Sequence, residues 1–210
     1  MTSTCPLCSN TGFSFFKNEK LHFYLCETCK GIFADKGLQL SAVKEKGRYE
    51  HHKNHINDLG YIKFADPIIS TVKKYFNPSH QGLDFGAGHT PVISEVLKSN
   101  KYLLDIYDPF FFDNKEVLKN KYDFIVCCEV IEHFFEPLKE FELLSNLLDP
   151  KAKLICMTFI YDKEIDFEKW FYKNDPTHVF LYQKETISWI KENFQFQNVE
   201  INDRLIVFTK

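Results

Sequence analysis

Short apolar runs alternate with longer segments of helical character through the second half of the chain. Four runs have the length of a buried strand, namely 81–85, 101–108, 122–128 and 152–159. Helices are predicted before and between them and near the chain end, at 62–76, 91–99, 137–148 and 186–194. Apolar strands that alternate with helices form a mostly parallel sheet covered on both faces. The pattern therefore predicts an α/β protein.

The two ends of the chain depart from this alternation. Two strand-like runs, 196–201 and 204–210, are separated only by Asn202 and Asp203, which predicts an antiparallel hairpin at the edge of the sheet. At the other end, residues 1–35 carry paired cysteines. The chain is therefore divided into a head (1–35), a polar connecting or lid segment (36–61) and the α/β body (62–210).

Composition excludes several classes of protein. The 210 residues are 44% hydrophobic and 26% charged, so the chain can bury a core and is neither disordered nor fibrous. The net charge is -3, and acidic and basic residues nearly balance in the head. The chain therefore lacks the excess of basic residues that is typical of proteins that bind nucleic acids or anionic membranes. No apolar run approaches the ~18 residues of a membrane span, and the start lacks a signal-peptide pattern. We therefore expect a cytoplasmic protein.

Four cysteines form two closely spaced pairs in the head. Cys5 and Cys8, like Cys26 and Cys29, are separated by two residues, and the segment 13–25 between the pairs can form a hairpin. This is the ligand spacing of a four-thiolate zinc ribbon. A head of about 35 residues has too small a core to fold without support, so we expect Zn²⁺ to have a structural role. Redox-active thiols are the alternative.

A turn with two glycines joins the first predicted strand of the body to the next helix. Gly86 and Gly88 allow the backbone to approach a ligand closely, and Pro91 suits the first helical turn. The next strand ends at Asp108, where doubly wound folds hold ribose hydroxyls, and Asp105 is the rival for that role. Pro91 occupies the position at which a dinucleotide-binding turn has its third glycine, and this disfavours a dinucleotide as the ligand. An ordinary tight turn is the alternative.

These segments occur in the order of the motifs of a known family. LDFGAGHTP, YDPFF and YDFIVCCEVIEHF resemble the motif series of class I S-adenosylmethionine-dependent methyltransferases, over about residues 81–210. With its cysteine head, the chain is similar to ribbon-bearing methyltransferases related to the quinone-biosynthesis methylases. The resemblance implies a Rossmann-like sheet and S-adenosylmethionine as the cofactor. One departure is Thr90 at the family's third motif glycine, where a side chain is expected to narrow the cofactor site or change its affinity.

The resemblance also implies roles for individual residues. In this family the Asp84 position lies near the methionyl amino group of the cofactor, and the Asp108 position binds its ribose hydroxyls. The full set of residues expected on the cofactor side is Asp84, Phe85, Gly86, Ala87, Gly88, Asp108, Pro109 and Glu129.

Two polar, aromatic stretches that flank the sheet, 48–54 and 170–179, share the similarity to this group. Their candidate acceptor-binding residues are Arg48, Tyr49, Trp170, Tyr172 and Asp175. Methyl transfer from a sulfonium is an in-line displacement, so the protein supplies alignment and, where the nucleophile carries a proton, a base. His133 and His178 are the base candidates, with His52 behind them, because imidazole titrates near neutral pH. The alternative is that these charged and aromatic residues have only structural roles, in surface ion pairs or in the core.

The expected reaction is methyl transfer from S-adenosylmethionine to a small or modest-sized acceptor. An RNA methyltransferase that holds its substrate with the zinc ribbon is the first alternative, and the charge balance of the head disfavours it. A noncatalytic zinc-ribbon adaptor that only binds the cofactor is the second, and turnover would exclude it.

Overall fold

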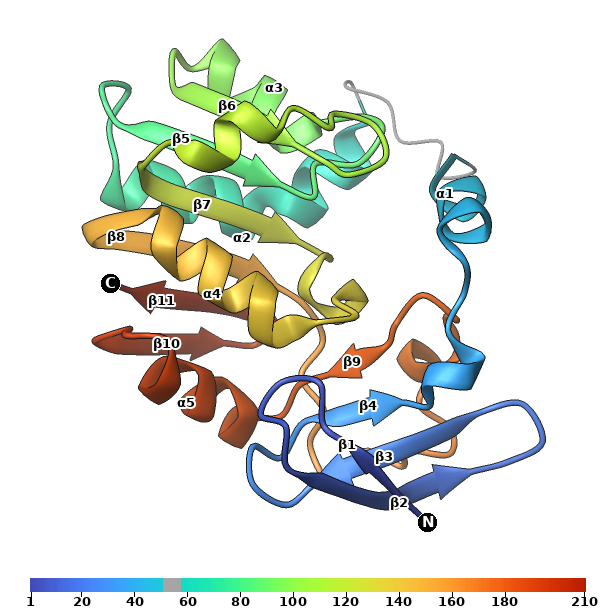
Figure 1. Cartoon of the computed structure of the whole chain (residues 1–210). Coiled ribbons are helices and arrows are strands. Elements are labelled where there is room, and N and C mark those ends of the chain that lie inside the picture. Colours follow the sequence, from blue (N-terminus) through green and yellow to red (C-terminus); the bar gives the residue numbers. More distant parts are fainter. Residues whose placement is uncertain (51–57) are drawn as a thin grey trace.

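The computed structural model describes residues 1–50 and 58–210, which contain two β-sheets (Figure 1). The strands of the larger sheet are β5 (Gln81–Phe85), β6 (Leu103–Tyr107), β7 (Tyr122–Cys128), β8 (Leu148–Met157), β10 (Asn198–Asn202) and β11 (Leu205–Thr209). Their spatial order is β10-β11-β8-β7-β5-β6; the last four are parallel, and β10 and β11 form an antiparallel hairpin beside β8. The predicted mostly parallel sheet with an antiparallel C-terminal hairpin is confirmed.

Strand β8 is longer than the apolar run that predicted it. Leu148 pairs with Tyr122 of β7, and after an irregularity Lys153 pairs with Phe124. Between these two contacts Lys151 has a φ of 70°, so the chain bulges out and then returns to the sheet. The exposed, polar residues of the bulge hid the first part of the strand in the sequence.

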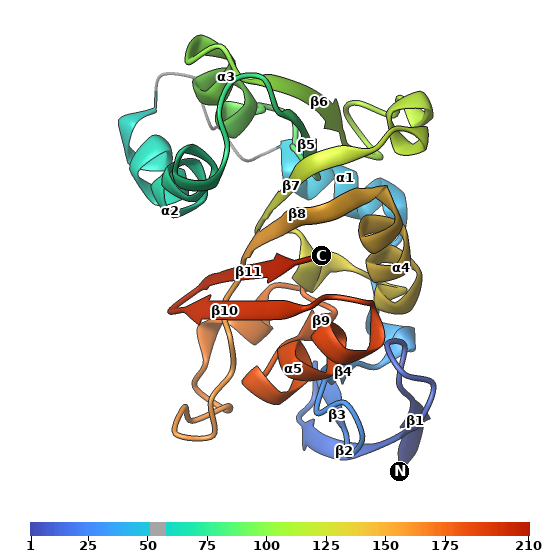
Figure 2. The ribbon, with the colours of Figure 1, turned by 90° about the vertical axis from the view of Figure 1, so that its left-hand side faces the viewer.

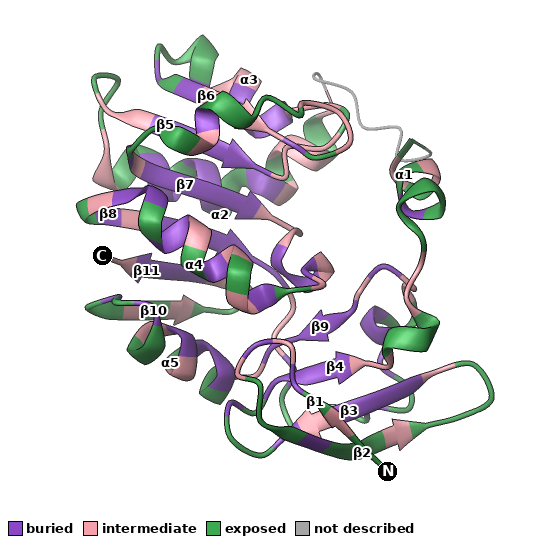
Figure 3. Cartoon of the chain, viewed as in Figure 1, coloured by how far each residue is buried: buried purple, intermediate pink, exposed green. Residues whose placement is uncertain are grey.

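Helices cover both faces of the larger sheet, as the sequence predicts (Figure 2). On one face α2 (Leu59–Tyr75) and α3 (Val92–Ser99) pack in a cluster with Phe124 and Val126 of β7. On the other face α4 (Pro137–Leu147) and α5 (Lys184–Asn193) pack with Ile125 and Cys127 of the same strand. Because side chains of a strand alternate between faces, one apolar run supplies both clusters. Figure 3 shows this central strand buried along most of its length.

The smaller sheet combines the N-terminal head with a segment from the far end of the chain. Its strands are β1 (Thr2–Thr4), β2 (Thr11–Lys17), β3 (His22–Cys26), β4 (Ile32–Ala34) and β9 (Phe180–Leu181), hydrogen-bonded in that order. The predicted hairpin is present as β2 and β3, which pair antiparallel. Strand β9 pairs antiparallel with β4, where Ile32 lies opposite Leu181 and Phe33 opposite Phe180. The head is thus joined to the body by a shared strand.

Two short elements lie between the sheets along the chain. A 3₁₀ turn (Lys36–Leu38) follows the head, and α1 (Ala42–Glu50) lies across from the C-terminal ends of the parallel strands (Figure 1). The segment boundaries at residues 35 and 61 stay predictions. None of the helices in the described part of the chain has both the length and the apolar character needed to cross a membrane.

Candidate active site

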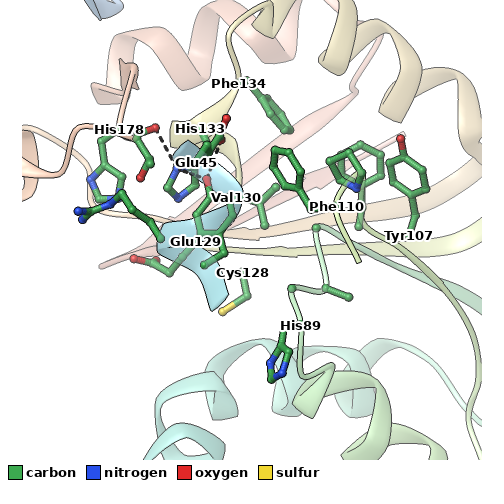
Figure 4. A pocket seen from close by; sticks show the side chains of 18 of the residues that line it. Glu45, His89, Tyr107, Phe110, Cys128, Glu129, Val130, His133, Phe134 and His178 are labelled. Atoms are coloured by element: carbon green, nitrogen blue, oxygen red, sulfur yellow. Dashed lines mark hydrogen bonds between the residues drawn. The ribbon is translucent and has the colours of Figure 1, made fainter. Parts of the chain in front are cut away.

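A cavity of about 770 Å³ lies at the C-terminal ends of β5, β6 and β7, with α1 on its opposite side (Figure 4). Its volume is in the range of small-molecule sites, which are about 300–1,000 Å³. In open α/β sheets, ligands bind at this end of the strands because the connecting loops there are free to shape a site. The cavity is therefore the candidate active site.

The turn after β5 forms one wall of the cavity. Gly86 and Gly88 have φ angles of 76° and 65°, which glycine adopts without steric cost. The Gly86 N–H donates to the Tyr107 carbonyl at 2.8 Å, which ties the turn to β6. A Cβ atom on Gly86 would lie 2.6 Å from both γ-methyl groups of Val130, whereas one on Gly88 would meet no atom of the described residues within 4 Å. Gly88 therefore leaves its backbone open to a ligand.

Asp108 fastens the end of β6 to this turn. Its Oδ2 accepts from the Gly88 N–H at 2.9 Å, and its Oδ1 accepts from the N–H groups of Phe110 and Phe111 at 2.8 and 3.1 Å. The rival Asp105 instead accepts from the Tyr122 hydroxyl at 2.8 Å. Of the two, Asp108 has the closer connection to the glycine turn, and the neighbouring Pro109 lines the cavity.

Asp84 lies behind the turn, in the core. Only 3% of its surface is exposed, and its Oδ2 accepts from the Ser94 hydroxyl at 2.8 Å. Burial raises the pKa of the Asp84 carboxyl to about 6, because a charged group is poorly solvated there. The structure places this residue behind the cavity wall rather than on it, since Phe85 and Gly86 line the cavity whereas Asp84 does not.

The raised pKa of Asp84 gives a pH-dependent stability. Between about pH 4 and pH 6 the folded chain keeps a proton that the unfolded chain loses, so the free energy of unfolding falls as pH rises through this window. A difference of about two pKa units corresponds to about 3 kcal/mol. The variant Asp84→Asn keeps an acceptor for Ser94 and is expected to lack this fall. Urea unfolding at pH 4, 5, 6 and 7 measures the difference; parallel curves for the two proteins would contradict it.

The opposite wall of the cavity carries the predicted base candidates. His133 and His178 both line the cavity, and their rings pack edge to face with centroids 4.9 Å apart. Nδ1 of His133 lies 2.9 Å from the Thr177 carbonyl, and Nδ1 of His178 lies 2.7 Å from the Tyr172 carbonyl. We call this pair the histidine wall. His52, the third candidate, lies outside the described residues.

Helix α1 contacts the histidine wall and the segment beside it. Arg48 forms an ion pair with Asp175 at 2.8 Å, and the Tyr49 hydroxyl lies 3.1 Å from Nδ1 of His133. The same hydroxyl donates to Glu45 at 2.8 Å. Burial raises the pKa of the Glu45 carboxyl, because the charged form is poorly solvated there. Three predicted acceptor-binding residues, from segments far apart in the sequence, thus line one side of the cavity.

The other two predicted acceptor-binding residues lie further back. Trp170 packs with Tyr161 and Phe167 in an aromatic cluster against the smaller sheet and is absent from the described cavity lining. Tyr172 is buried behind the histidine wall, where its hydroxyl donates to Glu132. Tyr172 thus lies outside the lining of the main cavity but borders an adjoining hollow that shares Asp175 and His178 with it. Trp170 packs against Tyr172 from behind.

Glu129 links the cavity to the edge of the sheet. Its Oε1 accepts from Arg204 Nη2 at 2.5 Å, and its backbone φ of 53° turns the chain out of β7. Burial and the neighbouring Glu132 carboxylate raise the pKa of Glu129 to about 7, and Arg204 opposes this rise. A carboxyl group that titrates near neutral pH is typical of functional sites.

The sequence did not indicate several cavity residues. Glu45 lies on a largely polar helix without an apolar stripe, so nothing marked it as buried. The aromatic side chains of Tyr61, Phe64 and Phe134 line the cavity from α2 and from the loop after β7. Apolar residues at such positions are expected in any core, and their exposure to a cavity appears only in three dimensions.

The four paired cysteines converge at one end of the smaller sheet, at the connections β1–β2 and β3–β4. Sγ of Cys5 lies 3.5 Å from Sγ of Cys29, and Sγ of Cys8 lies 3.3 Å from Sγ of Cys26. These distances exceed the ~2.05 Å of a disulfide. A tetrahedral zinc ion with Zn–S bonds of about 2.3 Å requires sulfurs about 3.8 Å apart, so a small outward movement accommodates it. The predicted four-cysteine cluster is confirmed as a possible metal site.

Residues 51–201 match the model of a family described as a methyltransferase domain. Because the match covers more than half of the chain, the chain belongs to this family. It is an S-adenosylmethionine-dependent methyltransferase domain, which confirms the predicted enzyme class and cofactor. No curated protein matches the sequence.

Solved structures share the fold at low identity. Magnesium protoporphyrin IX methyltransferase (ChlM) from Synechocystis PCC 6803, with bound SAH, is 16% identical (TM-score 0.55, 81% of this chain and 94% of that chain). The 1,6-didemethyltoxoflavin-N1-methyltransferase of Burkholderia thailandensis, with bound 1,6-didemethyltoxoflavin and S-adenosylhomocysteine, is 11% identical (TM-score 0.54, 94% and 98%). An O-methyltransferase family protein of Burkholderia thailandensis is also 11% identical (TM-score 0.54, 87% and 64%), so this chain spans less than two thirds of that protein. The relation to quinone-biosynthesis methylases stays a prediction.

Proposed function

We propose that this chain transfers a methyl group from S-adenosylmethionine to a small molecule held between the glycine turn and the histidine wall. The observation that carries the proposal is Gly88, whose backbone faces open space on the wall of a cavity of about 770 Å³ in a methyltransferase-domain fold. The cofactor supplies an electrophilic methyl group on a sulfonium, and transfer to an O–H or N–H nucleophile releases S-adenosylhomocysteine and a proton.

The residues of the turn are proposed to bind the cofactor. The backbone from Phe85 to Gly88 would lie along it, and Asp108 would accept from its ribose hydroxyls beside the Gly88 N–H that it already binds. Thr90 also lines the cavity, and its hydroxyl lies 2.8 Å from Nδ1 of His89. A side chain at the family's third glycine position is therefore compatible with a cavity of this size.

The acceptor is proposed to bind against α1 and the histidine wall. Tyr49, Phe110 and Phe134 offer aromatic surface for a planar molecule. The names of two structural neighbours, a magnesium protoporphyrin IX methyltransferase and a didemethyltoxoflavin methyltransferase, support a small-molecule acceptor. The proton that an O–H or N–H nucleophile loses would leave at the histidine wall, where His133 and His178 are the candidates for a base.

The four-cysteine cluster is proposed to hold a structural zinc ion. Three of its cysteines are buried, and the thiolates would fill all four positions of a tetrahedral ion, leaving none for a substrate. In this proposal the ion stabilises the smaller sheet and takes no part in methyl transfer.

Calorimetric titration with S-adenosylmethionine and S-adenosylhomocysteine, with NADH as a negative control, tests the proposal. We expect selective binding of the first two ligands. The variant Asp108→Ala is expected to weaken it by about 1.5–3 kcal/mol, or at least 10-fold, because hydrogen bonds to a charged group are lost. Asp105→Ala is the matched control and is expected to retain the affinity. If wild type and Asp108→Ala bound the cofactor with equal affinity, a residue other than Asp108 would contact the ribose.

Turnover separates an enzyme from a noncatalytic adaptor. The protein is incubated with S-adenosylmethionine carrying a labelled methyl group and with a set of aromatic and heterocyclic acceptors. Transfer of label to one of them, with release of S-adenosylhomocysteine, is the expected result. Cofactor binding without transfer to any acceptor class would favour the adaptor.

A further inference from the structure

One carboxylate and two imidazoles converge at the histidine wall. Glu132, His133 and His178 each offer a potential ligand atom, and these atoms all lie within 4.8 Å of one another. Within the described residues, this is the one such group besides the four-cysteine cluster. Glu132 and His133 are adjacent in the 3₁₀ turn after β7, whereas His178 comes from the segment before β9. The fold brings them together from positions about 45 residues apart.

The backbone sets the orientation of both imidazoles. Nδ1 of His178 lies 2.7 Å from the Tyr172 carbonyl, and Nδ1 of His133 lies 2.9 Å from the Thr177 carbonyl. Because a carbonyl only accepts, each Nδ1 is the nitrogen that donates, and each Nε2 is the nitrogen with a lone pair in the neutral ring. Histidines that ligate metals through Nε2 are held in this way by a second-layer hydrogen bond. Nε2 of His133 lies 4.0 Å from the Glu132 carboxylate.

Glu132 is a buried carboxylate that has no lysine or arginine partner among the described residues. Its side chain is fully buried, and its Oε1 accepts from the Tyr172 hydroxyl. Its Oε2 has no hydrogen-bond partner among the described residues. The two nearby arginines are paired with other carboxylates, Arg204 with Glu129 and Arg48 with Asp175. An uncompensated buried charge is costly, so a further cation beside Glu132 would stabilise the site.

We propose that Glu132, His133 and His178 bind a divalent metal ion, of which Mn²⁺ is the test case, at a site separate from the four-cysteine cluster. Two imidazoles and one carboxylate suit first-row divalent ions and leave coordination positions open. With metal–ligand bonds of about 2.0–2.2 Å, neighbouring ligand atoms lie about 3 Å apart, so the three side chains close by about 1 to 2 Å. Glu129, three residues earlier in the chain, interacts electrostatically with Glu132 and adds negative potential.

The proposed ion faces the cavity. His133 and His178 line it, and Arg48, Tyr49 and Asp175 surround the same region. This part of the inference rests on the proposed function: the open positions would take an oxygen or nitrogen donor of the acceptor. The favoured acceptors are therefore molecules that chelate metals, such as catechols or hydroxy-substituted heterocycles. The ion would lower the pKa of a bound hydroxyl, a task that a histidine base would otherwise perform.

Manganese binding by the zinc-loaded protein tests the site. Zinc per chain is first measured, and Mn²⁺ is then titrated while the electron paramagnetic resonance signal of free Mn²⁺ is followed. Thiolates prefer zinc to manganese, so the four-cysteine cluster does not compete. We expect one Mn²⁺ per chain in the wild type, and at least 10-fold weaker binding in Glu132→Gln and in His178→Gln. Absence of stoichiometric Mn²⁺ binding by the wild type overturns the inference.

A matched control is His22→Gln. His22 is also buried, and its Nδ1 lies 3.7 Å from Asp35, but no third ligand accompanies this pair in the described structure. Binding that falls equally in His22→Gln and His178→Gln would also overturn the inference. If Glu132→Gln does not fold, a rise in wild-type melting temperature with Mn²⁺ that is absent in His178→Gln serves instead. Titration with S-adenosylmethionine tests the proposed function independently, because cofactor binding without Mn²⁺ binding removes only the metal site.

Discussion

Replacement of Cys26 by serine is expected to abolish the proposed binding of zinc and to unfold the smaller sheet. Cys26 is fully buried at the end of β3, and its sulfur lies 3.3 Å from that of Cys8. Structural zinc contributes on the order of 10 kcal/mol to the folding of small domains, and three ligands hold it far less well than four. Zinc per chain should fall from one to nearly zero. Hydrogen exchange in residues 1–34 should rise strongly, while β5 and β7 keep their protection.

Cys127→Ala is the control for this experiment. Cys127 is equally buried but lies in β7, outside the four-cysteine cluster. It is expected to lower stability through a small cavity and to leave zinc content unchanged. Full zinc content in Cys26→Ser would remove the cluster as the metal site. Loss of zinc with an intact smaller sheet would show that its contacts with the body are sufficient for folding.

The second large effect is expected from a substitution in the glycine turn, and it concerns both stability and cofactor affinity. Gly86→Ala is expected to lower the free energy of unfolding by about 2–5 kcal/mol. A left-handed φ costs an alanine about 1–2 kcal/mol, and overpacking against Val130 adds about 1–3 kcal/mol. Cofactor affinity should fall as well, because the turn must shift away from Val130. Urea unfolding and calorimetric titration measure the two effects separately.

Gly88→Ala separates backbone strain from crowding. Its φ of 65° is similar to that of Gly86, but an added Cβ would meet no atom within 4 Å in the described part of the chain. Its stability should therefore fall only by the cost of the φ, about 1–2 kcal/mol. The double variant Gly86→Ala/Val130→Ala should recover stability relative to Gly86→Ala alone. Equal losses in both single variants would contradict a role for the Val130 contact.

The sequence predicted those elements whose apolar pattern reflects burial by their immediate neighbours. Strand β7 is apolar on both faces because helices cover both, and its boundaries 122–128 were predicted without error. Strand β9 has only two residues, Phe180 and Leu181, too few to show an alternation. Helix α1 is largely polar, and its place at the cavity depends on tertiary contacts such as that between Arg48 and Asp175. Such long-range contacts leave no periodic signal.

In the candidate site, too, the sequence predicted residues that belong to a local motif and missed arrangements that depend on tertiary contacts. The glycine turn and Asp108 were predicted because a local motif requires them, and the structure brings them within a hydrogen bond of each other. For Trp170 and Tyr172, composition alone did not distinguish a cavity wall from the layer behind it. The cluster of Glu132 with two histidines depends on the approach of His178 to the turn after β7. That approach is a property of the assembled fold.

The strand shared between the two sheets constrains the order of assembly during synthesis. Strand β4 leaves the ribosome early, but its partner β9 follows only after nearly 150 further residues. Until then the nascent head has an unpaired strand edge, which is prone to association with other chains. Early capture of zinc by the four cysteines would hold β1–β4 in place during this interval. The last contact to form is then at Val179, whose carbonyl accepts from Ala34 and whose N–H donates to the Glu132 carbonyl. The candidate active-site cavity is therefore completed when the head docks.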